Sequence, residues 1–127
     1  MKPATAKSKG RETENSCAEF LQQWWPDAER KRLKGSKDEG DITGIGYRVI
    51  EVKSGGILYI PQWMRELQTE RENLRDRLSL LATWSPEQVM PLPPGMVAVR
   101  PVGKPNPEDW WAIQPLRDVC ELWSNDL

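Results

Sequence analysis

Three charged residues in the middle of the chain, Asp41, Glu51 and Lys53, have the types and the spacing of a small acidic site. They lie in segment 41–53, where two β-rich stretches flank a glycine-containing turn and predict a β-hairpin. In an antiparallel hairpin centred on Gly46, Asp41 and Glu51 are directly opposite each other, with Cβ atoms about 5 Å apart. Lys53 shares their face because side chains alternate along a strand. The segment therefore predicts two carboxylates and one ammonium side by side.

This combination suits the hydrolysis of phosphodiester bonds. Two neighbouring carboxylates can bind one Mg²⁺ ion, with Mn²⁺ as the alternative, through hard oxygen ligands. Such a cation polarises the phosphate and lowers the pKa of bound water, and a lysine can stabilise the charge that develops during the reaction. The alternative is a surface hairpin without a functional site, in which Lys53 forms an ordinary salt bridge with Asp41 or Glu51. Such a salt bridge contributes less than ~1 kcal/mol to stability.

A fourth carboxylate is expected from the first helix. Between Arg11 and Trp24 the apolar residues recur at steps of three and four, which predicts an amphipathic helix that ends at Pro26. Glu14 continues the apolar stripe of this helix. Because burying an unpaired carboxylate costs several kcal/mol, Glu14 needs a metal ion or the Lys53 ammonium as a partner.

The segment from Gly40 to Lys53 resembles the PD-(D/E)-x-K nuclease motif, with Gly40 in place of the proline and I-E-V-K at its end. The stretches K-G-R-E-T-E at 9–14 and G-S-K at 35–37 resemble, more specifically, the archaeal-type Holliday-junction resolvases and their phage-borne relatives. Further similar residues are Trp63, Gln68, Trp110, Trp111, Pro115 and Leu116. The likeness covers most of residues 9–123.

This resemblance implies a restriction-endonuclease-like α/β fold, with a central mixed sheet flanked by helices, and metal-dependent endonuclease activity. It implies catalytic roles for Glu14, Asp41, Glu51 and Lys53, with Asp41 and Glu51 as the metal ligands. It also places Ser36 on a mobile loop near the scissile phosphate. The implied partners are branched or four-way DNA and a second copy of the chain, because nicking two symmetric strands of a junction needs two active sites.

Segment 69–94 departs from that family because it is longer and richer in Glu, Arg and Pro, which leaves the dimer surface and the junction preference open. Two other functions also stay open. A repair or restriction-like nuclease acting on flaps or duplex ends would use the same hairpin chemistry. A non-catalytic DNA-binding or assembly module would keep the fold without the activity, but the presence of Asp41, Glu51 and Lys53 favours a nuclease.

Positive charge is concentrated at the start of the chain. Residues 1–37 carry a balance of +4 and the remaining residues a balance of −5. A basic edge beside an acidic body is typical of a protein that contacts phosphate on one face, although lysines at such an edge can also simply protect a strand from pairing. We expect contacts with the DNA backbone from Lys9, Arg11, Arg30, Arg32, Lys34 and Lys37.

A small set of elements must position these residues. The expected order is α-β-β-β-α-β-β-α, which suggests a central mixed sheet with helices packed on it. After the first helix come an exposed strand at 27–34, the two hairpin strands, a helix at 61–82, strands at 95–101 and 109–114, and a closing helix at 115–123.

Length and composition limit the alternatives. A chain of 127 residues has room for one domain, which we place at 10–127 after a flexible basic tail at 1–9. Without histidine, and with Cys17 and Cys120 far apart, neither a zinc site nor a disulfide framework is indicated, and both cysteines are expected to be buried thiols. No apolar run approaches the roughly 20 residues that span a bilayer, and the start lacks the apolar stretch of a signal peptide. We therefore expect no membrane partner and a cytoplasmic location, in the host cytoplasm if the chain is phage-encoded.

Overall fold

The computed structural model describes residues 6–32, 38–55, 59–81 and 90–125. For residues 6–9 it describes the backbone alone. Its elements follow in the order α1 (Ala6–Leu21), β1 (Glu29–Arg30), β2 (Ile42–Thr43), β3 (Val49–Ser54), α2 (Ile60–Leu81), β4 (Gly95–Arg100), η2 (Pro107–Asp109), β5 (Trp111–Ile113) and α3 (Leu116–Ser124). Apart from the short 3₁₀ helix η2, this is the order expected from the sequence. The protein is a mixed α/β structure.

The strands form two sheets. The larger one has the order β3-β4-β5, with β3 and β4 parallel and β4 and β5 antiparallel. The parallel pairing follows from the connection, because α2 crosses over between β3 and β4 as parallel strands require. Its register sets Glu51 opposite Val97 and Lys53 opposite Val99. The larger sheet is therefore mixed, as expected.

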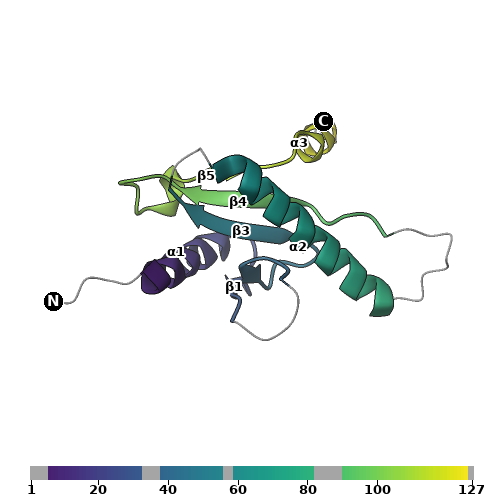
Figure 1. Cartoon of the computed structure of the whole chain (residues 1–127), viewed down its shortest axis with the longest axis horizontal. Helices are drawn as coiled ribbons and strands as arrows, with labels where there is room; N and C mark the ends of the chain where they lie inside the picture. The colour runs from purple at the N-terminus through teal and green to yellow at the C-terminus, as the bar shows by residue number, and fades with distance from the viewer. Residues whose placement is uncertain (1–5, 33–37, 56–58, 82–89, 126–127) are drawn as a thin grey trace.

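Helices cover both faces of β3, so this strand is buried on both sides (Figure 1). Ile50 and Val52 pack with α1 in one apolar cluster that also contains Cys17 and Leu21. Val49, on the opposite face, packs with α2 in a second cluster. Since side chains alternate along a strand, Glu51 and Lys53 share the face of Val49 and lie under α2.

The expected hairpin between residues 41–43 and 49–53 does not form. Instead β2 pairs with β1 in a separate two-stranded antiparallel sheet, with Arg30 opposite Ile42. The chain turns towards β1 at Gly44, whose φ is +79° and whose Cα approaches the backbone of Asp27 so closely that an added Cβ would lie 2.0 Å from the Asp27 carbonyl oxygen. Only glycine fits such a contact, so the turn packs against the segment before β1.

The structure also corrects two expectations about residues 6–9 and Cys120. The backbone of residues 6–9, expected to belong to a flexible tail, is the first part of α1. Cys17 is buried as expected, but Cys120 is exposed. The reason is that Cys120 lies on α3, none of whose residues is buried.

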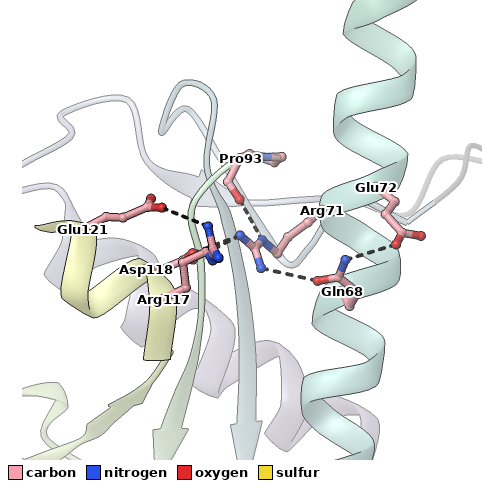
Figure 2. A network of polar contacts seen from close by, with 7 residues as sticks. All are labelled: Gln68, Arg71, Glu72, Pro93, Arg117, Asp118 and Glu121. Carbon is pink, nitrogen blue, oxygen red and sulfur yellow. Dashed lines mark hydrogen bonds and ion pairs between the residues drawn. The ribbon is translucent and has the colours of Figure 1, made fainter. Parts of the chain in front are cut away.

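Helix α3 is held by a polar contact to α2. The buried Arg71 of α2 donates from Nε to the carbonyl oxygen of Pro93 at 2.7 Å and from Nη2 to both oxygens of Asp118 at 3.1 and 3.2 Å. Figure 2 shows Arg71 between these partners, with α3 beyond Asp118. The apolar residues Leu116 and Trp123 of α3 are 79% and 72% exposed, so a guanidinium contact anchors this helix in place of a core contact.

Among the residues that the structure describes, none of the helices is both long and apolar enough to cross a membrane.

Candidate functional site

Asp41 lies at the edge of β3 and is bonded to that strand at two points. Its backbone N–H donates to the carbonyl oxygen of Ile50 at 2.9 Å, and its carboxylate oxygen Oδ2 accepts the N–H of Val52 at 2.7 Å. Asp41 thus reaches the neighbourhood of Glu51 without the hairpin pairing that the sequence suggested. Burial raises the pKa of Asp41, and the bonds to the Val52 N–H and the Glu51 side chain oppose this.

Glu51 is the centre of the cluster and is only 6% exposed. Burial raises its pKa to about 11, with further contributions from a bond to the Glu70 carboxyl and from the charge of Asp41, while Lys53 acts in the opposite direction. Glu51 Oε2 has no hydrogen-bond partner among the described residues. A buried carboxylate in this position needs a proton or a cation.

Glu70 comes from α2, and its carboxyl group is hydrogen-bonded to that of Glu51. It is 3% exposed, and burial raises its pKa to about 7, assisted by the charges of Asp38 and Asp41. Its Oε2 also lacks a partner in the described part of the chain. One oxygen each of Asp38, Glu51 and Glu70 lie within 4.8 Å of one another, a grouping that could hold a metal ion.

Lys53 is half-buried and forms ion pairs with two acidic residues. Its Nζ lies 2.7 Å from Glu66 Oε2 and 3.5 Å from Glu51 Oε1. Burial lowers the pKa of Lys53, but the contacts with Glu66 and Glu51 outweigh this and leave the pKa above its ordinary value. The amine is therefore charged and already partnered.

Glu14 lies beside the same cluster, on the α1 side, and is half-buried rather than fully buried. Burial and the charge of Asp41 raise its pKa, while Arg30 and Lys53 lower it. The structure thus brings Glu14, Asp41, Glu51 and Lys53 into one neighbourhood, as the sequence predicted.

The expected DNA contacts are only partly placed. Arg30 is half-buried in β1, Arg11 is exposed on α1 and Arg32 is exposed after β1. Lys9 belongs to α1 by its backbone. The other expected residues, Lys34, Ser36 and Lys37, lie outside the described residues.

Sequence reasoning missed the two acidic residues of α2, Glu66 and Glu70. They are four residues apart and thus share one face of the helix. The signal was present, because Glu70 falls in a buried stripe with Trp63, Leu67 and Leu74 at steps of three and four. This is the pattern that singled out Glu14 on the first helix.

Without a proton on Glu51 and Glu70, the charges at the site would not balance. Glu51 and Glu70 are both buried, and Asp38 and Asp41 lie close to them. The nearby ammonium group of Lys53 forms ion pairs with both Glu51 and Glu66. Hard carboxylate oxygens with free lone pairs are the donors that Mg²⁺, Mn²⁺ and Ca²⁺ prefer. The grouping of Asp38, Glu51 and Glu70 could therefore hold a metal ion, with the charged Lys53 beside Glu51.

No protein-family model matches the chain, and neither a curated protein nor a solved structure matches it.

Proposed function

We propose that the protein is a divalent-metal-dependent DNA endonuclease of restriction-endonuclease-like fold that acts on branched DNA, with a four-way junction as its leading substrate. Asp41 and Glu51 are the metal ligands in this proposal, Lys53 is the electrophilic group and Glu14 is an accessory carboxylate. The metal is Mg²⁺, with Mn²⁺ as a substitute. When bound, such an ion supplies positive charge to the phosphate and makes the attacking water more acidic.

One observation carries the proposal: two carboxylates and a lysine meet at β3 although nothing in a simple salt bridge would require it. Asp41 and Glu51 are in contact at the strand edge, and Lys53 is 3.5 Å from Glu51. An isolated ion pair needs one acid, whereas this lysine faces several, with an orphaned oxygen on Glu51. A cation would take the place of the proton that the raised pKa of Glu51 requires in the metal-free protein.

The roles of the side chains follow from their contacts. The Asp41 carboxylate accepts the Val52 N–H through Oδ2 and also contacts the Glu51 carboxyl, so a cation bound there would replace the proton between the two acids. Lys53 is placed to stabilise negative charge that develops on a phosphate oxygen, provided that it leaves Glu66. Because Glu66 is on α2 and partly exposed, a DNA phosphate can compete with it for the ammonium.

The fold also supports this assignment. A helix, three strands, a crossover helix and a parallel fourth strand place Glu51 and Lys53 on β3, an edge strand of the mixed sheet. The homodimer belongs to the proposal as well, and the exposed apolar residues of α3, Leu116, Leu122 and Trp123, offer a surface for it.

The test is a cleavage assay on the full chain with labelled four-way junction, flap, duplex and single-stranded DNA, in Mg²⁺, Mn²⁺ or EDTA. The proposal expects metal-dependent nicking with the junction cut fastest. Faster cleavage of flaps or duplex ends would identify a repair or restriction-like nuclease instead.

A different class of function is a non-catalytic DNA-binding or assembly module, and the 2.7 Å contact that neutralises Lys53 with Glu66 favours it. Its signature would be junction binding without cleavage in either metal. That result would overturn the endonuclease.

A further inference from the structure

Glu70 lies where α2 should present an apolar side chain. Its neighbours along the buried stripe of α2 are Trp63, Leu67 and Leu74, which pack on the sheet. A carboxylate at such a position is costly unless a proton, a hydrogen-bond donor or a cation satisfies it. None of the described lysine or arginine residues forms an ion pair with Glu70.

The unsatisfied oxygens point to the missing partner. Oε2 of Glu51 and Oε2 of Glu70 are both buried without a hydrogen-bond partner in the described residues. Lys53 reaches the other oxygen of Glu51, Oε1. Two buried carboxyl groups in contact thus each keep one oxygen that only a proton or a cation can satisfy.

The third acidic residue is fixed against α2 by its own segment of chain. Asn73 of α2 donates to the carbonyl oxygen of Asp38 at 2.7 Å, and Arg77 of α2 contacts the Glu39 carboxylate at 2.6 and 3.0 Å. The Asp38 side chain is oriented by the Gly40 N–H, which donates to its Oδ1 at 2.9 Å. The helix therefore holds Asp38 beside Glu70, with Asp38 on the solvent side.

We propose that Glu70 is a ligand of a divalent cation, which it binds together with Glu51 and Asp38 on the α2 side of β3. One oxygen of each lies within 4.8 Å of the others. Asp41 approaches Glu51 from the strand edge, so Glu51 is shared between Asp41 and this group. The inference rests on the proposed function in that both use a divalent cation, and it adds a helix ligand that the sequence motif does not contain.

The experiment measures Mn²⁺ binding to the full chain without DNA near neutral pH. Electron paramagnetic resonance reports the concentration of free Mn²⁺. Glu70→Gln keeps the shape of the side chain and removes its charge, and should weaken Mn²⁺ binding at least about tenfold. Asp38→Asn, whose amide oxygen can still accept the Gly40 N–H, should weaken binding as well. Glu72→Gln is the matched control, because Glu72 lies on the same helix, accepts a hydrogen bond from Gln68 and is outside the acidic group, and it should bind as wild type does.

Two results would overturn the proposal: a wild-type chain that binds no Mn²⁺ at millimolar concentration, or a Glu70→Gln variant that binds it as tightly as wild type. If Glu70→Gln fails to fold, Asp38→Asn decides, since Asp38 is exposed and its backbone contacts are unaffected. Unchanged Mn²⁺ affinity in Asp38→Asn would then contradict the site.

The outcome is separable from that of the cleavage assay. Glu70-dependent Mn²⁺ binding without cleavage of any DNA would reject the endonuclease and leave the metal site standing. Metal-dependent cleavage by a protein whose Mn²⁺ affinity does not change in Glu70→Gln would support the endonuclease and reject the metal site at Glu70.

Discussion

Lys53 on β3 and Glu66 on α2 form an ion pair with 2.7 Å between Nζ and Oε2, shorter than the 3.5 Å from the same Nζ to Glu51. The side chain of Glu66 is 35% exposed, so water weakens this pair and its contribution to stability is small. The contact makes the lysine available to a competing anion, because a phosphate can replace an exposed carboxylate at little cost.

We therefore expect Lys53→Ala and Glu66→Gln to differ sharply in a cleavage assay. Lys53→Ala removes the group proposed to stabilise developing charge and should slow cleavage by at least ~10²-fold while junction binding persists. Glu66→Gln should change the rate less than about tenfold and the free energy of unfolding by no more than ~1 kcal/mol. Equal and large losses in the two variants would show that the pair is structural.

Asp41 has a structural contact with the Val52 N–H and a proposed role as a metal ligand, and different substitutions can separate the two. Asp41→Asn keeps an oxygen that can accept the Val52 N–H, so metal-free protein should be at least as stable as wild type because the acidic cluster loses one charge. Asp41→Ala leaves that N–H without its acceptor and should lower the free energy of unfolding by about 1–3 kcal/mol. Chemical denaturation in EDTA measures both.

The same Asp41→Asn variant tests the metal ligand. Cleavage should fall by at least ~10²-fold. Added Mg²⁺ or Mn²⁺ should raise the melting temperature of wild type more than that of the variant, because a ligand stabilises only the folded state that binds it. Full activity of Asp41→Asn would support the ordinary salt bridge. So would a variant of lower stability together with a wild type whose melting temperature does not change with either cation.

The stability of the metal-free protein should fall as the pH rises through about 7, the value to which burial raises the pKa of Glu70. The unfolded chain releases this proton near its ordinary pKa of 4.5, whereas the folded protein retains it to a higher pH. The stabilisation from Glu70 is therefore fully present below the unfolded pKa and is lost as the pH rises through the folded one. Thermal melts of wild type and Glu70→Gln in EDTA give the difference directly.

That difference should shift in favour of Glu70→Gln between acidic and neutral pH, and Mn²⁺ should restore wild type at neutral pH by replacing the proton. A difference that does not change with pH would contradict the buried carboxyl pair.

Arg30 and Arg32 should bind the DNA backbone without reading its sequence. Reversing both to Glu should weaken binding to every DNA substrate to a similar extent and make its salt dependence shallower by about two counterions. Reversing Lys104 and Arg117, both exposed and far along the chain, matches the change in net charge and should have the smaller effect. Loss of binding to only one sequence would indicate contacts to bases.

Much of the fold follows from local patterns in the sequence. The order of helices and strands was predicted correctly, because each element carries its own periodicity and its own proline or glycine boundaries. The placement of Glu51 and Lys53 on one face was also predictable, since it depends only on alternation along β3. Glu14 was identified by its position on a helical stripe, which is equally local.

Only the tertiary structure determined which element covers the face of β3 that carries Glu51 and Lys53. Local pattern suggested a hairpin, but β2 pairs with β1, and β3 pairs with β4 across the α2 crossover, far along the chain. This non-local pairing places α2 over Glu51 and Lys53, so Glu66 and Glu70 become their neighbours. Asp41 still reaches Glu51, through a bond from its carboxylate to the Val52 N–H rather than through a strand ladder. The sequence by itself determined which residues carry the charge, and the packing of α2 on β3 determined that these charges are buried together, because burial depends on contacts between segments that no local pattern records.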